Sequence, residues 1–537
     1  MSLLDALLLD PSRINVWLAL RSDGNKGSGT QSDPYNAGTA ARFDGLMNSF
    51  GEFTTVRLGP GLFETKGFSD DDPSSGWQPK AGMKIIGSGI DVTTLRLVGA
   101  GGNHRHYFAI GHALASGSGP GVQVDFFEAS DFTVDCNLNE GGGASFARGA
   151  IRIKGNHARI RRIKAKEWGT KSSQKPCVVF SVIIADPDAT VAEVQDAGIS
   201  ECVVITPASG TLEPVTFFHA GGKDAVLALK EAYGICPFIR DCFADGGQSA
   251  PSSKDFRGLS MDRCMGGIVE GNQIHNCKIG GPYQENTNTR EITVRGNFYN
   301  NVSRGPYWNL GQLHTSQTLS SLIRDPGDSS IAKATTSLSS HGLKAGERVK
   351  VDASGGSPAQ FKGVFVIKDV PEVNQFRYQM VSAPAQDAST GSFQKVMSVA
   401  RLIAENNSVE LAGGSEGILG LHLHDAAVAG QAPDHVHGDI IVRNNKISYV
   451  AMVYDGSYAG SGMELNGAEG LRVEDNTVDV QPANPIRNQR CGAVTYFNNK
   501  TPTGVLIQGF NDDTDKRYDE LETEAEDALV LALLNRG

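Results

Sequence analysis

The 537-residue chain has little of several features that mark common protein classes. Its eight cysteines include no C-x-x-C pair, which argues against a disulfide scaffold, a zinc ribbon or a dithiol redox motif. Aromatic residues make up only 7% of the chain, and the 49 basic residues are outnumbered by 60 acidic ones. The resulting formal charge of −11 disfavours a general nucleic-acid binder, which needs a basic surface, so we expect no nucleic-acid partner.

Long apolar runs and a secretion signal are also missing. No run reaches the ~18 apolar residues that a membrane span needs, so we expect no membrane span. The segment from Met1 to Arg13 lacks a basic n-region and carries Asp5 inside its apolar stretch, so we expect no Sec signal peptide there. Two locations follow: extracellular or virion-associated, reached by a route that the sequence does not show, or else cytoplasmic.

Glycine, in contrast, is abundant, with 64 residues and no Gly-X-Y period. Together with many Asn residues and short apolar runs, it is typical of a turn-rich β protein. The length alone suggests three or four domains, unless one elongated architecture takes most of the chain.

A short pattern recurs along the chain, in which an Asn stands between two short apolar segments. Its five Asn copies, and the two copies in which Cys replaces Asn, are Asn272, Asn297, Asn407, Asn445, Asn476, Cys202 and Cys242. Neighbouring copies lie 25 residues (272 to 297), 30 residues (242 to 272) and 31 residues (445 to 476) apart, the length of one β-solenoid coil with variable loops. Coils stack about 4.8 Å apart, so equivalent side chains face one another and stacked Asn amides hydrogen-bond. The alternative is a β-sandwich with Asn-rich turns between its hairpins.

Upstream segments fit the same frame: Thr55 to Thr65, Met83 to Leu97, Phe132 to Asn137 and Ala150 to Ile160. These phrases resemble the right-handed parallel β-helix of the pectate-lyase-like superfamily, which includes polysaccharide lyases, polygalacturonase-type hydrolases and phage tailspikes. The resemblance covers roughly residues 50–320 and 398–510, and no catalytic motif is matched residue for residue. It implies an all-β, right-handed, single-stranded parallel β-helix and a polysaccharide or oligosaccharide partner.

Three regions stand outside the repeat. The predicted segments are an N-terminal strand, loop and capping helix (1–52), the first part of the β-helix (53–320), an inserted small β domain (321–397), the second part of the β-helix (398–510) and a C-terminal amphipathic helix (511–537). An N-terminal helix would cover the apolar end of the solenoid. The C-terminal helix packs back on the solenoid or makes an oligomer contact.

Candidate chemistry concentrates between residues 241 and 314. The predicted catalytic residues are Asp241, Asp245, Asp262, Glu285 and Arg290. Paired carboxylates act as general acid and base on a glycosidic bond. Alternatively they hold Ca²⁺ against a uronate while a basic side chain removes a proton, which makes Ca²⁺ or another divalent metal a candidate cofactor.

Two similar loops in the same stretch each contain Gly-Pro-Tyr. They end in Tyr283 and Tyr307, 24 residues apart, about one coil, which predicts an aromatic ridge. The predicted substrate-binding residues are Tyr283, Tyr307, Trp308 and His314. Aromatic rings offer flat apolar faces on which sugar rings stack.

A histidine-rich stretch follows further along the chain. The predicted metal ligands are His422, His424, Asp425, His435 and His437. Strand alternation puts His422 and His424 on one face, and imidazoles with carboxylates bind Zn²⁺ or another divalent ion. A pH-sensitive surface or a solvated strand explains the same residues without a metal.

These observations leave three functional hypotheses. The first is a tailspike-like or extracellular β-helix protein, forming a homotrimer, that binds a polysaccharide and cleaves it as a lyase or glycoside hydrolase. The second is a non-catalytic structural or adhesion rod in a phage-tail-like or surface assembly. The third is a metal-dependent hydrolase centred on the histidines.

Overall fold

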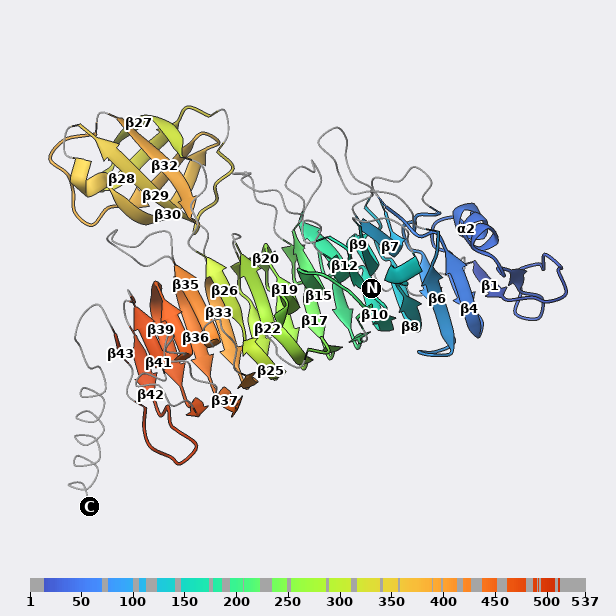
Figure 1. Cartoon of the computed structure of the whole chain (residues 1–537). Helices are drawn as coiled ribbons and strands as arrows, with labels where there is room; N and C mark the ends of the chain where they lie inside the picture. Colours follow the sequence, from blue (N-terminus) through green and yellow to red (C-terminus); the bar gives the residue numbers. More distant parts are fainter. Residues whose placement is uncertain are drawn as a thin grey trace, which may run out of the picture.

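The computed structural model describes residues 14–69, 76–99, 106–112, 123–140, 146–172, 177–185, 194–205, 207–222, 234–248, 253–285, 289–310, 316–338, 341–355, 358–388, 390–396, 399–412, 419–425, 437–451, 461–479, 486–489, 491, 494–507 and 510–511. These residues form a long solenoid of parallel strands, a closed barrel inserted into it and a helix near the N-terminal end (Figure 1).

The solenoid has three faces, because each coil contributes up to three runs of strand that pair in parallel with their counterparts in the next coil. Face 1 consists of β1 (Asn15–Ala19), β3 (Thr55–Leu58), β5 (Lys84–Ile86), the first part of β8 (Glu128–Asp135) and of β10 (Arg159–Lys166), β13 (Gly198–Ser200), β17 (Phe238–Arg240), β21 (Ile268–Glu270), β24 (Thr293–Arg295), β33 (Val399–Glu405), β36 (His437–Arg443), β39 (Ala468–Glu474) and β42 (Thr495–Phe497).

Face 2 consists of β4 (Gly61–Thr65), β6 (Thr93–Leu97), the second part of β8 and of β10, β14 (Val203–Val204), β18 (Phe243–Asp245), the first part of β22 (Gln273–Glu285), β25 (Phe298–Arg304), β34 (Ser408–Ala412), β37 (Lys446–Ala451) and β40 (Thr477–Asp479). Face 3 consists of β7 (His106–Gly111), β9 (Ala147–Lys154), β12 (Cys177–Ala185), β15 (Val215–Gly222), β19 (Phe256–Met261), the last part of β22, β26 (Tyr307–Leu310), β35 (Leu419–Asp425), β38 (Ser461–Asn466), β41 (Ile486–Gln489) and β43 (Phe510–Asn511). Shorter pieces are β2 (Tyr35–Asn36), η1 (Leu138–Glu140), β11 (Gly169–Thr170), β16 (Gly234–Ile235), β20 (Cys264–Met265) and β23 (Thr289–Arg290).

A column of buried Asn side chains runs along the corner between faces 1 and 2. The column consists of Asn272, Asn297, Asn407, Asn445, Asn476 and Asn499. The backbone N and Nδ2 of Asn272 both donate to Oδ1 of Asn297, at 3.0 and 2.9 Å, and Nδ2 also donates to the Ile239 carbonyl. The same bonds repeat from coil to coil, so the buried amides satisfy one another. The predicted Asn column is confirmed, with Asn499 as a copy that the repeat search did not find.

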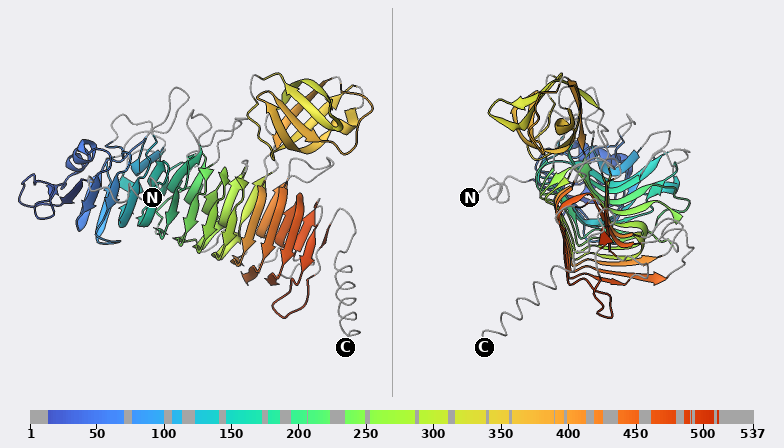
Figure 2. Two further views of the ribbon diagram at one scale, coloured as in Figure 1. Left: turned by 180° about the vertical axis from the view of Figure 1, so that it is seen from behind. Right: turned by 90° about the vertical axis from the view of Figure 1, so that its left-hand side faces the viewer.

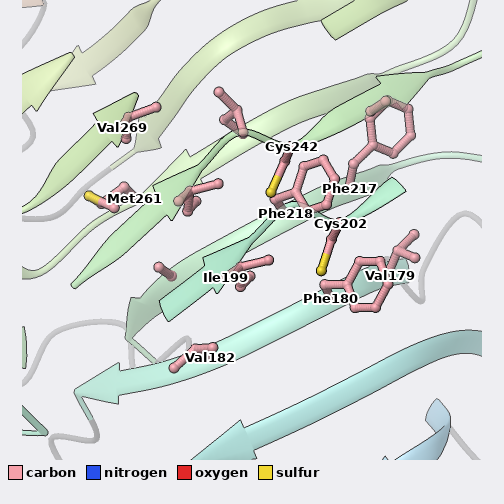
Figure 3. Close-up of a cluster of buried hydrophobic side chains, with 14 of the residues drawn as sticks. Val179, Phe180, Val182, Ile199, Cys202, Phe217, Phe218, Cys242, Met261 and Val269 are labelled. Carbon is pink, nitrogen blue, oxygen red and sulfur yellow. The ribbon is translucent and has the colours of Figure 1, made fainter. Parts of the chain in front are cut away.

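The same corner position is apolar or a thiol in the four coils that precede the column. Cys202 and Cys242 point into the core beside stacked aromatic rings, as Figure 3 shows. The rings of Phe180 and Phe218 are parallel within 4° with centroids 5.9 Å apart. The backbone N of Cys242 donates to Asn272 Oδ1 at 3.0 Å, so the hydrogen-bonded column begins at the backbone amide of this residue.

The inserted domain is a closed antiparallel barrel between β26 and β33. Its strands are β27 (Gln317–Asp325), β28 (Asp328–Thr336), β29 (Arg348–Ser354), β30 (Gly363–Glu372), β31 (Gln375–Gln379) and β32 (Thr390–Val396), with the short helix η3 (Pro358–Phe361). The barrel has its own core and a fully buried ion pair between Lys395 and Glu347, 3.0 Å apart. It lies beside the solenoid in all views of Figures 1 and 2.

The one α-helix in the described part of the chain, α2 (Ala40–Ser49), packs near the first coils. The Thr39 hydroxyl caps it by accepting from the Arg42 amide, and Phe43 packs against Phe63. Asp44 is buried on this helix, and burial raises the pKa of its carboxyl group. Apart from residue 511, the predicted C-terminal helix lies outside the described residues. The predicted fold class, an all-β parallel β-helix with an inserted small β domain, is confirmed. No helix in the described part of the chain is long and apolar enough to cross a membrane.

Candidate functional site

A row of polar and aromatic residues runs along face 3, one residue per coil. In register from coil to coil, this face 3 row consists of Arg152, Ser181, His219, Ser260, Tyr283, Tyr307, His422, Glu464 and Arg487. The residues on either side in the strands point inward and are buried: Phe180 and Val182 flank Ser181, and Phe218 and Ala220 flank His219. Strand alternation therefore turns Ser181 and His219 outward, and the strand register spaces the positions of the row one coil apart.

Three side chains at one end of the row contact one another. Ser181 Oγ lies 3.0 Å from His219 Nδ1, and the other ring nitrogen, Nε2, lies 3.9 Å from Asp262 Oδ2. Asp262 directly follows β19, one coil after His219. The side chains of His219 and Asp262 are 14% and 16% exposed, and Ser181 is 2% exposed. The structure thus connects a hydroxyl, an imidazole and a carboxylate in series.

Gly221 provides the space in which His219 and Asp262 approach each other. A Cβ atom at position 221 would lie 2.4 Å from Asp262 Oδ1 and 2.5 Å from His219 Nε2. Any larger residue would therefore push the imidazole and the carboxylate away. The nearby thiol of Cys264 is not an alternative nucleophile, because burial and the adjacent Asp262 charge raise its pKa and keep it protonated.

The two predicted loop tyrosines meet further along the row. The rings of Tyr283 and Tyr307 are parallel within 3°, with centroids 5.7 Å apart. Guanidinium groups cover these rings as well: Arg257 lies 4.1 Å from the Tyr283 centroid and Arg304 lies 4.9 Å from that of Tyr307. The predicted ridge exists, but Tyr283 is only 9% exposed, so its ring face is not open to a sugar.

Trp308 is a correction to the predicted binding residues. Its side chain is fully buried and belongs to the solenoid core, because it follows Tyr307 in β26 and so points to the opposite side of the strand. Its ring cannot contact a surface ligand.

The predicted catalytic aspartates do not gather in one place. Asp241 lies at the corner between β17 and β18 with a left-handed backbone, φ 52°. Asp245 ends β18 on face 2, where it accepts from Asn276 Nδ2 at 2.8 Å and from the Gly247 amide. Only Asp262 belongs to face 3. Among these aspartates, the structure brings Asp262 alone to the row.

Of the remaining predicted residues, Arg290 contacts the inserted barrel and the side chains of the others lie outside the described part of the chain. Arg290 is in β23, and its Nη1 lies 3.4 Å from the Ala345 carbonyl at the base of the inserted barrel. The side chains of Glu285, His422, His424, Asp425 and His437, and all of His314 and His435, lie outside the described residues. Within the part of the chain that is described, no group of three His, Cys, Asp or Glu side chains could hold a metal ion.

Two members of the site, Ser181 and His219, were not predicted. Each is a polar residue with apolar neighbours on both sides in its strand, in Val-Phe-Ser181-Val-Ile and Phe-Phe-His219-Ala. Aligning the long apolar strands would have placed both in one column with Ser260. The Asn repeat does not reveal this column, because it marks a different corner of the coil.

The comparisons with known proteins find similarity in structure and not in sequence. No family model and no curated protein matches the chain. Among solved structures, the chain is similar to the A-module of the mannuronan C-5 epimerase AlgE4 of Azotobacter vinelandii (10% identity, 92% of this chain and 97% of that chain covered, TM-score 0.38). It is also similar to the tailspike protein gp49 of Acinetobacter baumannii bacteriophage Fri1, a capsular polysaccharide depolymerase (9%, 72% and 86%, TM-score 0.22), and to the PL6 family alginate lyase AlyGC (10%, 87% and 52%, TM-score 0.26). At these TM-scores the likeness carries no argument about the activity of this chain.

Proposed function

We propose that this chain binds polysaccharide along the face 3 row, with Tyr283 and Tyr307 at the centre of the binding surface. The observation that carries the proposal is the stacked tyrosine pair with its two guanidinium groups, held on adjacent coils of a rigid sheet. A linear ligand suits such a row, because the row places one residue at every coil.

The contacts of the tyrosine pair define how a sugar would bind. Since the ring faces are occupied by one another and by arginine, the ligand meets ring edges, hydroxyl groups and guanidinium N–H groups. Guanidinium groups bind carboxylates with two parallel hydrogen bonds, so a uronate or another acidic sugar fits best. Arg257 is already oriented, because Asp255 accepts two of its hydrogen bonds, at 3.1 and 2.6 Å.

A panel of acidic and neutral polysaccharides tests the proposal. Binding is measured by calorimetry, and cleavage by ultraviolet absorbance of unsaturated uronates and by reducing ends. For the polysaccharide that binds the wild-type chain, Tyr307→Ala should raise the dissociation constant at least tenfold. Phe238→Ala is the matched control, because Phe238 is an aromatic ring on face 1 that also lies beneath arginines, Arg159 at 4.8 Å and Arg240 at 5.0 Å. Equal loss in both variants would contradict the proposal.

The tailspike-like setting is a further part of the proposal. It requires a homotrimer, with three times the chain mass of 57.0 kDa measured by light scattering. If no polysaccharide binds and the chain is monomeric, the second hypothesis, a non-catalytic rod, replaces it. The continuous Asn column favours that rigid rod as the scaffold in either case.

A further inference from the structure

We infer that Ser181, His219 and Asp262 form a hydrolytic centre that removes acyl groups from ester substrates. In this centre Ser181 is the nucleophile, His219 the general base and acid, and Asp262 the positioning carboxylate. This activity goes beyond glycan binding and uses the N-terminal end of the face 3 row, in coils that precede the tyrosine pair.

The connectivity of the three side chains is that of an activated serine. A serine hydroxyl becomes a nucleophile when a base within hydrogen-bond reach takes its proton and a third group orients the base. Ser181 Oγ and His219 Nδ1 are 3.0 Å apart, and Asp262 Oδ2 lies 3.9 Å from Nε2 on the far side of the ring. The carboxylate therefore stabilises the imidazolium that forms when Nδ1 accepts the proton.

Several independent features of the fold together hold the three side chains in contact. The three residues come from three consecutive coils of face 3, and their strands are paired in register. Gly221 is required as well, because a Cβ atom there would collide with both His219 and Asp262.

The reaction follows from these positions and balances. Ser181 Oγ attacks the ester carbonyl carbon while its proton passes to His219 Nδ1. The C–O bond to the alcohol then breaks, and His219 returns the proton to the leaving oxygen, which leaves an acyl group on Ser181. Water attacks this acyl group, His219 takes one water proton and returns it to Ser181 Oγ, and the carboxylic acid is released.

The oxyanion of each tetrahedral intermediate needs a positively polarised partner. Arg152 holds the register position beside Ser181, on the side away from His219. A cation at that position would stabilise the developing negative charge. The row thus orders a cation, a nucleophile and a base along consecutive coils.

The natural substrate class rests on the proposed function. His219 lies two coils from Tyr283, about 10 Å along the same row. A polysaccharide that binds at Tyr283 would therefore extend to the hydrolytic centre. The ester would be an acyl substituent, such as acetyl, on the bound glycan. The hydrolytic centre itself does not depend on this assignment.

A fluorophosphonate probe and para-nitrophenyl acetate test the inference without a glycan. The wild-type chain should be labelled by the probe at Ser181, as located by mass spectrometry of its peptides, and should release para-nitrophenol. Ser181→Ala should abolish labelling and lower ester hydrolysis at least a hundredfold. Ser200→Ala is the matched control, because Ser200 carries a serine hydroxyl at the end of β13 on face 1, outside the face 3 row, and its loss should leave both readouts unchanged.

Asp262→Asn separates a positioning role from a structural one. If Asp262 stabilises the imidazolium, kcat falls at least tenfold while KM and the thermal unfolding midpoint stay the same. The labelling experiment on wild-type protein needs no variant, so its result does not depend on whether the variants fold. Labelling at another residue, no labelling, or hydrolysis that survives Ser181→Ala would each overturn the inference. Because the probe carries no sugar, esterase activity without glycan binding would refute only the proposed function.

Discussion

The corner between faces 1 and 2 is built differently in the two halves of the solenoid. In four earlier coils the position is filled by Phe132, Ile163, Cys202 and Cys242. In each of the six coils that follow, it is filled by an Asn. All are buried, and the backbone just before the position is left-handed in both halves, as at Asp241 (φ 52°) and Asn444 (φ 54°). The same bend can therefore be stabilised by packing alone or by a column of amide hydrogen bonds.

The two solutions differ in how the coils depend on one another. A Cys or Ile at the corner packs against whatever surrounds it, so its contribution scales with buried area. An Asn in the column is donor and acceptor to its neighbours, so each amide needs the next one. We therefore expect the later coils to tolerate substitution at this corner much less well than the earlier coils.

The largest effect should follow from removing one amide in the middle of the column. Asn407 Oδ1 accepts from both nitrogens of Asn297, and its Nδ2 donates to the Val294 carbonyl. Asn407→Ala orphans these buried groups, at about 1–3 kcal/mol each, so the free energy of unfolding in urea should fall by about 3 kcal/mol or more. Asn300→Ala is the control, because its outward amide bonds only Glu410 among the described partners. Similar losses in both variants would mean that the column is dispensable.

The thiol half of the corner should respond less. Cys242→Ala removes one buried sulfur and leaves the bond from its backbone N to Asn272 intact, so the loss should be about 1 kcal/mol. Burial also raises the pKa of the Cys242 thiol, so it should react with Ellman's reagent only after unfolding. The exposed Cys236 is the control, and it should react in the folded protein. Rapid reaction of Cys242 would show that this half of the corner opens.

The left-handed residue before the column offers a reciprocal test. Gly296 has φ +62° and open space around its Cα, so Gly296→Ala should cost about 1 kcal/mol through backbone strain alone. Glu201 holds the same position in the thiol half with φ 53°, so Glu201→Gly should relieve that strain and stabilise by up to about 1 kcal/mol. Both free energies are measured by urea unfolding. Changes of the same sign would show that the two halves of the corner do not share one backbone geometry.

The amino-acid sequence reveals one half of this corner and conceals the other. Asn272 and its counterparts stand out because a polar residue recurs between apolar ones, whereas Phe132 and Ile163 look like their strand neighbours. Asn499 does not fit the pattern, because Phe497 precedes the Asn pair but the residues that follow, Lys500 and Thr501, are polar.

The site was harder to predict than the fold, because its contacts join distant positions. Ser181 and His219 are 38 residues apart, and this separation differs from that between neighbouring Asn copies because coil lengths vary. The carboxylate alone makes Asp262 a candidate catalytic residue, and only the register of face 3 shows that it meets His219. The prediction for Trp308 is wrong because strand alternation places its ring opposite that of Tyr307, on the core side of β26.

The smallest effect concerns a charge at the corner in the apolar half. Asp131 precedes Phe132 with φ 66°, and Arg162 in the next coil donates to both its carboxylate oxygens, at 2.6 and 2.9 Å. This guanidinium lowers the pKa of the Asp131 carboxyl group, so the pair stabilises the fold above the ordinary Asp pKa of about 3.9. The stabilisation is lost as pH falls through the lowered folded-state pKa. Because the pair is partly exposed, we expect no more than about 1 kcal/mol.

Asp131→Asn isolates this contribution, since Asn adopts the same left-handed backbone. The difference in free energy of unfolding between wild type and variant should be constant from pH 7 to pH 5 and should shrink toward zero below about pH 4. Asn406 and Asn444 hold the equivalent position in the Asn half without charge, so Asn444→Ser serves as a control whose effect is independent of pH in this range. A constant difference for Asp131→Asn down to pH 2 would mean that the corner is held by backbone geometry alone and that the ion pair across the coils contributes nothing.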